Sequence, residues 1–225
     1  MQIIKRPKRK VRVVIFDVDR TLYPKRAEFF TRGQRREIMV VAQKWSVSFH
    51  EAKRRIKERQ KKLSRSKKGR KKRKVTRTEA LISLGISKHW WNKVRKNCWK
   101  PRGELKPNRR VIAIVEDLAQ ELRLVAASNA TRPMSMRTLD VLHILPFFKV
   151  VWGPDSAGEA KHHIVYWQRL ARRLKIRPRN CVVVGDRREA DCDPAIRAGF
   201  GGAILVRGPS DLWKVRQYLL NNLKK

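Results

Sequence analysis

Short apolar runs recur along the chain, and several of them end at a polar residue or a glycine. These runs are too short for typical helices and rich in β-branched residues, which favours strands buried on both faces of a parallel sheet. The predicted strands cover residues 11–16, 124–127, 147–152, 181–184 and 203–206.

Between most of these runs, apolar residues return at helical spacing. In 109–121, Val111, Val115 and Leu118 would lie on one stripe, and Asn108 can cap the helix. The predicted helices in this part of the chain cover 109–121, 133–142, 160–174, a short turn at Ile196 and 211–223. Strands that alternate with helices predict an α/β fold with a doubly wound, Rossmann-like parallel sheet.

The stretch between the first two predicted strands is helical throughout. Helices are predicted at 35–45 and 49–63, followed by a second helical unit that ends near Trp99. We therefore expect a helical cap at 25–106, inserted after the first strand of a core formed by 1–24 and 107–225, with 1–10 as a basic arm. The tryptophans of the second unit, Trp90, Trp91 and Trp99, could stack on nucleic-acid bases or form a small core.

The charge is far from balanced, with 57 Lys and Arg against 19 Asp and Glu and a formal net charge of +38. Self-repulsion at this level destabilises a compact chain unless a polyanion offsets it. We expect a nucleic-acid partner, with RNA or a ribonucleoprotein as the leading class. A membrane partner is not expected, because no basic helix carries a sustained apolar face.

One segment concentrates this charge. Residues 64–74 contain no apolar side chain, so they cannot bury a face and are expected to be disordered until they meet a partner. The candidate nucleic-acid-binding residues in this segment are Lys67, Lys68, Arg70, Lys71, Lys72, Arg73 and Lys74.

The remaining composition predicts a soluble intracellular protein of the cytoplasm or an organelle matrix. No stretch approaches the ~20 apolar residues of a membrane span, and a strand, not a signal-peptide core, follows the basic leader. The three cysteines are an odd number without metal-type pairing, so neither a disulfide framework nor a structural zinc site is expected.

Two carboxylates end the first predicted strand. If the strand continued through Asp17 and Asp19, both side chains would lie on one face at its carboxyl end, where ligands of open α/β sheets bind. Such a pair can bind a hard cation such as Mg²⁺, or divide the roles of nucleophile and proton-transfer group. An ordinary solvated turn is the alternative interpretation of the same pair.

Four motifs in register resemble the haloacid dehalogenase superfamily. They are the Asp17-Val18-Asp19-Arg20-Thr21-Leu22-Tyr23-Pro24 stretch, Ser128-Asn129, Lys161, and Gly185-Asp186 with Asp191 after it. Within the superfamily, the Thr-Leu-Tyr-Pro ending and the helical insertion are similar to pyrimidine 5′-nucleotidases and related small phosphatases.

The resemblance implies a Mg²⁺-dependent phosphohydrolase. Asp17 would form an aspartyl-phosphate and Asp19 would transfer the proton, while Ser128 and Lys161 would stabilise the phosphoryl oxygens. Thr21 and Asn129 would contact substrate. The implied metal ligands are Asp17, the Asp19 backbone carbonyl, Asp186 and, as a ligand or from the second shell, Asp191.

The sequence departs from the family pattern beside this site. Arg20 stands where Asn or Gly is usual, Arg187 where Ser or Thr is usual, and His162 where Pro is usual. The extra positive charge would weaken Mg²⁺ binding or favour a polyanionic substrate. Two functions follow: a phosphomonoesterase acting on a phosphorylated small molecule or nucleotide and associated with nucleic acid, or a structural RNA-binding component of a ribosome-like particle with weak or no catalysis.

Overall fold

The computed structural model describes residues 1–25, 27–64 and 75–221. The chain divides into two compact units: unit 1 is 1–26 with 101–225, and unit 2 is 27–100, within the predicted cap. The seven basic residues predicted to bind nucleic acid, from Lys67 to Lys74, lie outside the described residues, as does all of 64–74 except Ser64.

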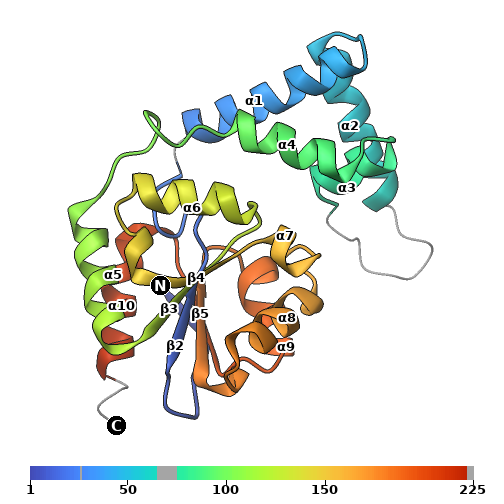
Figure 1. The fold of residues 1–225 in the computed structure, drawn as a ribbon. Coiled ribbons are helices and arrows are strands. Elements are labelled where there is room, and N and C mark those ends of the chain that lie inside the picture. Colours follow the sequence, from blue (N-terminus) through green and yellow to red (C-terminus); the bar gives the residue numbers. More distant parts are fainter. Residues whose placement is uncertain (26, 65–74, 222–225) are drawn as a thin grey trace. The chain divides into compact units, whose positions relative to one another are not determined.

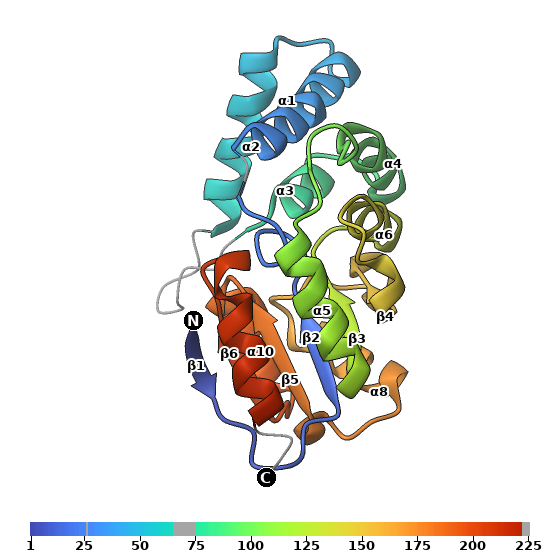
Figure 2. The same ribbon diagram turned by 90° about the vertical axis from the view of Figure 1, so that its left-hand side faces the viewer.

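A six-stranded sheet forms the centre of unit 1, with the strand order β1-β6-β5-β2-β3-β4 (Figures 1 and 2). Five strands are parallel, and only β1 runs antiparallel to its neighbour, β6. The strands are β1 Gln2–Lys5, β2 Val13–Phe16, β3 Arg123–Ala127, β4 Phe148–Trp152, β5 Cys181–Gly185 and β6 Gly202–Leu205. The predicted α/β fold is confirmed.

The edge strand β1 corrects one prediction. Residues 1–10 were expected to form a basic arm, but Ile3 pairs with Ile204 across the β1/β6 ladder. A four-residue strand with flanking charges carries too little periodicity to be recognised in the sequence. Its pairing covers β6, which would otherwise form one edge of the sheet.

The register of the sheet brings the ends of three strands together. Along the central strand β2, Phe16 lies opposite Ala126 of β3 and Val184 of β5. All four residues of β2 are buried, which explains its unbroken apolar sequence. The residues that follow β2, β3 and β5 therefore meet at one edge of the sheet.

Helices cover both faces of the sheet, with α5 and α10 on one face and α8 and α9 on the other (Figures 1 and 2). The helices of unit 1 are α5 Arg109–Glu121, α6 Arg132–Val141, α7 Pro154–Ala157, α8 Ile164–Leu174, α9 Asp193–Arg197 and α10 Leu212–Asn221. Shorter turns are η1 Leu145–Phe147, η2 Pro178–Asn180, the π-helix η3 Arg188–Cys192 and η4 Pro209–Asp211.

The helix predicted at 160–174 begins four residues later, at Ile164. The preceding residues form turns, and Lys161 lies in them with its backbone N–H donating to Asn129 Oδ1 at 2.9 Å. The amphipathic face of α8 presents Tyr166, Trp167 and Leu170 to the sheet. Burial of this face anchors the turn that carries Lys161.

Unit 2 consists of helices. They are α1 Ala27–Lys44, α2 Phe49–Ser64, α3 Arg77–Ser83 and α4 Lys88–Cys98. Thr76 caps α3 in a reciprocal capping box with Glu79. Of the three tryptophans, Trp91 and Trp99 are buried core residues, which excludes base stacking by them in this state. None of the described helices is both long and apolar enough to cross a membrane.

Candidate active site

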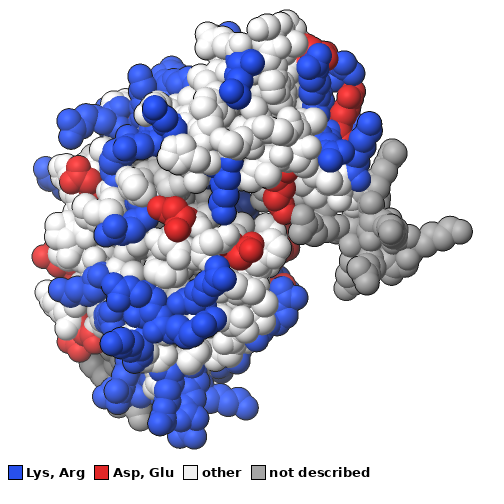
Figure 3. Space-filling view, turned by 45° about the vertical axis from the view of Figure 1, so that its right-hand side comes forward, with Lys and Arg blue, Asp and Glu red and all other residues white. Residues whose placement is uncertain are grey.

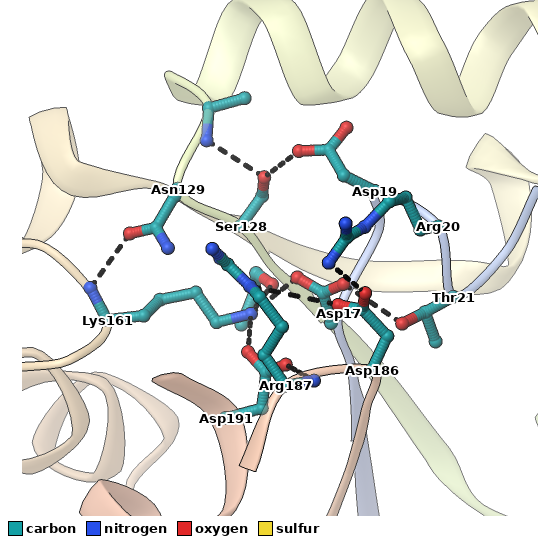
Figure 4. Close-up of polar contacts among 12 residues, drawn as sticks. Asp17, Asp19, Arg20, Thr21, Ser128, Asn129, Lys161, Asp186, Arg187 and Asp191 are labelled. Carbon is teal, nitrogen blue, oxygen red and sulfur yellow. Dashed lines mark hydrogen bonds and ion pairs between the residues drawn. The ribbon is translucent and has the colours of Figure 1, made fainter. Parts of the chain in front are cut away.

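Asp17 follows β2 directly and is held from both sides. Its backbone N–H continues the sheet by donating to Val184 O at 2.8 Å. Its side chain is only 5% exposed, and its Oδ2 accepts a hydrogen bond from Thr21 Oγ1 at 2.9 Å. Its Oδ1 lies 2.5 Å from the ammonium of Lys161 (Figure 4). The carboxylate is thus fixed at the carboxyl end of the central strand.

Lys161 is fully buried. Its ammonium donates to Asp17 Oδ1 and to Ala127 O at 3.0 Å, and it forms an ion pair with Asp191 Oδ1 at 2.6 Å. The backbone carbonyl of Lys161 accepts from Trp167 Nε1 at 2.7 Å, which joins the turn to α8. A buried lysine of this kind is tolerated only where charge partners and acceptors are supplied together.

Asp191 reaches the site from the π-helix η3. It has no exposed surface, and its Oδ2 accepts the backbone N–H of Arg187 at 2.9 Å. A Cβ on Gly185 would lie 2.5 Å from this carboxyl group, so a larger residue there would displace it. The wider turn of the π-helix and the glycine together let Asp191 approach Lys161.

Asp186, which follows β5, is paired with an arginine. Its Oδ2 forms an ion pair with the guanidinium of Arg20, and its Oδ1 lies 3.8 Å from Arg187 Nε. Arg20 has a φ of 68°, in the left-handed region that non-glycine residues rarely adopt. The two arginines singled out as departures from the family pattern therefore both contact the same carboxylate.

Asp19 turns towards a different set of partners. Its Oδ2 accepts from Ser128 Oγ at 3.2 Å, and its Oδ1 accepts from Tyr23 Oη at 2.6 Å. Ser128 Oγ in turn accepts the backbone N–H of Ala130 at 2.9 Å, which fixes its orientation. Sequence reasoning assigned no role to Tyr23, although it lies four residues after Asp19 in the same turn.

Tyr166, a second tyrosine without an assigned role, links the site to α8 through hydrogen bonds. Tyr166 Oη lies 3.2 Å from the carbonyl of Ser128 and 3.0 Å from that of Trp152, to which it donates. It thereby ties the ends of β3 and β4 to α8.

Burial changes the acid-base properties of these groups. Burial raises the pKa of Asp17 to about 7 against the opposing effect of Lys161, and the charges of Asp191 and Asp19 add to the rise. Although burial opposes it, the charges of Asp17 and Asp191 raise the pKa of Lys161, which therefore stays protonated. Burial raises the pKa of Asp186 too, while Arg20 works in the other direction.

Three of these carboxylates have the geometry of a cation site. Oxygen atoms of Asp17, Asp186 and Asp191 all lie within 4.8 Å of one another. Hard divalent cations such as Mg²⁺ take carboxylate oxygens as ligands, so this donor set fits the ion that the sequence implies. The Asp19 carboxylate is not part of this group, and its predicted contribution through the backbone carbonyl stays a prediction.

The site residues predicted at the ends of strands thus converge, and Figure 4 shows Asp17, Lys161, Asp186 and Asp191 around one point. A family model for haloacid dehalogenase-like hydrolases matches residues 11–199, from just before β2 to just after α9. The chain belongs to this family. The charged cluster of this haloacid dehalogenase-like hydrolase, Lys161 with Asp17 and Asp191, lies within the matched residues.

Solved structures of this family share the fold. An HAD phosphatase from Thermococcus onnurineus is 17% identical, with a TM-score of 0.62 over 91% of this chain and 97% of its own. A 2-haloacid dehalogenase from Pseudomonas syringae is 18% identical, with a TM-score of 0.58 over 92% of this chain and 99% of its own. YfnB from Bacillus subtilis, in a magnesium-bound form, is 17% identical, with a TM-score of 0.58 over 93% of this chain and 100% of its own.

At these identities the similarity establishes the fold alone. No match was found among the curated proteins. The narrower resemblance to pyrimidine 5′-nucleotidases stays a prediction, and the reaction has to be argued from the site itself.

Proposed function

We propose that this haloacid dehalogenase-like hydrolase is a Mg²⁺-dependent phosphomonoesterase that acts through an aspartyl-phosphate on Asp17. One observation carries the proposal: a buried carboxylate at the end of the central strand is held by a fully buried lysine beside two further carboxylates. This arrangement provides a nucleophile, a cation for the phosphoryl oxygens and a donor set for Mg²⁺.

The first half of the reaction transfers the phosphoryl group to the protein. An oxygen of Asp17 bonds to phosphorus while the bond from phosphorus to the leaving oxygen breaks, and Asp19 delivers its proton to that oxygen. In the second half, the Asp19 carboxylate takes a proton from a water molecule whose oxygen bonds to phosphorus. The bond to Asp17 then breaks, inorganic phosphate leaves, and both side chains return to their starting states.

Other residues of the chain hold these groups in place. The hydrogen bonds from Ser128 and Tyr23 orient the two oxygens of Asp19, and Thr21 orients Asp17. Lys161 would balance the charge on the phosphoryl oxygens, with Ser128 and Asn129 as further substrate contacts. A Mg²⁺ ion bound by Asp17, Asp186 and Asp191 would reduce the repulsion between a phosphate dianion and these carboxylates.

Phosphate fits the site better than an alkyl halide, although structural relatives include dehalogenases. A halide leaves without a proton, so a positioned acid such as Asp19 would have no role in its departure. Alkyl halides are also neutral at the reacting carbon and would not require a cation site built from three carboxylates.

The test compares two substitutions of the same chemical kind. Asp17→Asn should lower the hydrolysis of an aryl phosphate in the presence of Mg²⁺ by at least about a thousandfold. Asp117→Asn is the matched control, because Asp117 is a half-exposed carboxylate of unit 1 that pairs with Arg216 away from the site. Wild-type protein that hydrolyses no substrate in a panel of nucleotides and phosphosugars, or that releases halide from 2-haloacids instead, would contradict the proposal.

A second candidate function rests on the charge of +38, which a small-molecule phosphatase does not need. We infer that the protein associates with nucleic acid, with RNA in a ribonucleoprotein as the first class to test. In the extreme case it would be a structural or assembly component with little turnover. Binding to RNA that weakens steeply with salt would support this inference, and elution free of nucleic acid at low salt together with salt-independent binding would contradict it.

A further inference from the structure

A strongly basic hollow lies at the edge of the sheet opposite the candidate active site. Arg12 directly precedes β2, and residues 175–180 directly precede β5, whereas Asp17 and Asp186 follow the same two strands. At ~3.3 Å per residue, the five steps along β2 separate Arg12 from Asp17 by about 16 Å. A ligand bound in this hollow would therefore leave the active site accessible.

Five cationic side chains line the hollow, which has a volume of about 400 Å³. All five are exposed, no carboxylate is among the lining residues, and none of the five forms an ion pair with any described residue. The lining residues are Arg9, Arg12, Lys175, Ile176, Arg177, Arg179 and Asn180.

The two segments that supply these cations are far apart in sequence but joined in the structure. Asn180 accepts the backbone N–H of Arg12 at 2.9 Å through its carbonyl, and its Nδ2 donates to the carbonyl of Lys10 at 2.8 Å. These two bonds hold the segment before β2 against η2. The positive charges are thus brought together by the fold.

The hollow also continues into a second one, of about 680 Å³, with which it shares Lys175, Ile176 and Arg177. The second hollow adds Arg172 at the end of α8 and an apolar floor that includes Ala171 and Pro178. Two adjoining hollows that are both lined by cations offer several positions for phosphates, which suits a chain of phosphates better than a single anion.

Some cations outside the hollow are paired with carboxylates. Arg54 pairs with two glutamates, and Arg216 pairs with Asp117. Figure 3 shows Lys and Arg crowded over the lower part of the face that it views, with few Asp or Glu among them. The negative end of the α8 dipole accounts for favourable placement of Lys175 and Arg172, but not for Arg9, Arg12, Arg177 or Arg179.

We propose that this hollow is a nucleic-acid-binding groove that takes the phosphodiester backbone. The proposal rests on the nucleic-acid association inferred above and is independent of the hydrolase activity. A lipid surface fits less well, because the site is concave and the large apolar side chains exposed in the described residues, Met39, Leu63, Ile82 and Trp213, do not line it.

Two triple variants of the full chain remove the same charge at different places. The groove variant is Arg12→Gln with Arg177→Gln and Arg179→Gln. The control variant is Lys106→Gln with Arg109→Gln and Lys149→Gln, three exposed cations of unit 1 outside both hollows. Both retain residues 65–74, so any contribution of that segment is equal in the two.

Binding of a short single-stranded RNA is measured by fluorescence anisotropy over a series of KCl concentrations. The affinity of the groove variant should fall at least about tenfold. Its plot of log K against log salt concentration should become less steep by about 2, as expected for three lost phosphate contacts. The control should lose less than about threefold. Aryl-phosphate hydrolysis and the melting temperature should match the wild type in both variants.

Three results would overturn the groove. If both variants lose affinity equally, the attraction is diffuse and the nucleic-acid association stands without a groove. If the groove variant loses binding to phosphatidylserine vesicles but not to RNA, the surface is one for lipid. If the wild-type protein shows no salt-dependent binding to RNA or to DNA of the same sequence, the groove and the nucleic-acid association both fail.

Discussion

In each unit of the molecule, the described residues include a buried cluster of opposite charges. In unit 1, Lys161 lies between Asp17 and Asp191 with no exposed surface. In unit 2, Glu37 of α1 is 2% exposed and accepts hydrogen bonds from Arg77 and from Trp99 Nε1, the latter at 2.7 Å. Both clusters join segments that are distant in sequence. In unit 1 two carboxylates face one lysine, whereas in unit 2 one carboxylate faces two arginines.

The cluster of unit 2 is complete without any other molecule. Arg95 Nε lies 3.6 Å from Glu37, so one carboxylate faces two guanidinium groups and an indole N–H. Its role is to hold α1, α3 and the end of α4 together. In unit 1 the carboxylates outnumber the lysine, and burial raises the pKa of Asp17 to about 7. An excess of buried negative charge favours binding of an external cation.

The comparison shows that a buried charge does not by itself identify a functional site. What distinguishes unit 1 is the surplus of carboxylates at the carboxyl edge of a parallel sheet, where ligands bind in folds of this class. A cluster whose charges are matched within the protein, as in unit 2, is explained by packing and specificity.

The largest effect is expected from Lys161→Met, which removes the cation from the unit 1 cluster at similar volume. The variant should lose about a thousandfold in kcat for an aryl phosphate, because the phosphoryl oxygens lose their cation. It should also lose about 3 kcal/mol of stability without added divalent cation, because Asp17 and Asp191 then face each other uncompensated. Steady-state kinetics and urea denaturation measure the two losses.

The double variant Lys161→Met with Asp191→Asn serves as the control for this explanation. Removing one of the two opposed carboxylates should restore part of the lost stability but none of the lost turnover. If the double variant is less stable than Lys161→Met alone, the loss does not arise from uncompensated charge.

The second-largest effect is a loss of stability in unit 2, expected when Glu37 is replaced. Glu37→Leu leaves Arg77 and Arg95 without their carboxylate and Trp99 without its acceptor, which should cost about 3 kcal/mol within unit 2. Hydrogen exchange of the amides of α1 and α4 should become roughly 100-fold faster, and exchange in α5 and α8 of unit 1 should stay the same.

Glu37→Gln keeps an acceptor for Trp99 and removes only the charge, so it should show a smaller acceleration than Glu37→Leu. If Glu37→Leu instead exchanges as slowly as the wild-type protein, the cluster does not hold unit 2 together. Equal acceleration in the two variants would show that the charge matters and the hydrogen bond to Trp99 does not.

The core of the fold was predictable because its sequence signals are local. The parallel strands are continuous apolar runs, and helices such as α5 carry both a cap and a stripe. The edge strand β1 was missed because its pairing depends on β6, some 200 residues away, and not on a pattern of its own. The start of α8 was placed too early because the turn before it has no strong breaker.

The site was predictable to the extent that parallel strands bring their ends together. Asp17, Ser128 and Asp186 all follow strands, and Lys161 came from spacing within a family resemblance. The Glu37 cluster was not foreseen, since its partners lie in α3, in α4 and at the C-cap of α4, and share no motif. Which cation neutralises Asp186 also depends on a side-chain orientation that the sequence does not encode locally.

The smallest expected effect is a change in Mg²⁺ affinity when the ion pair between Arg20 and Asp186 is removed. It tests whether the carboxylates of unit 1 carry more negative charge than the protein itself neutralises. Arg20→Asn removes the guanidinium from Asp186, and Asn tolerates the left-handed backbone at this position. Its affinity for Mg²⁺, measured by titration calorimetry without substrate, should rise about tenfold, or ~1.4 kcal/mol. Arg187→Gln is the matched control and should change the affinity by less than about threefold, since Arg187 lies farther from the carboxylate and is partly screened by solvent. Unchanged or weaker Mg²⁺ binding by Arg20→Asn would mean that Arg20 does not compete for this site, and that the surplus charge is already balanced within the protein, as it is around Glu37.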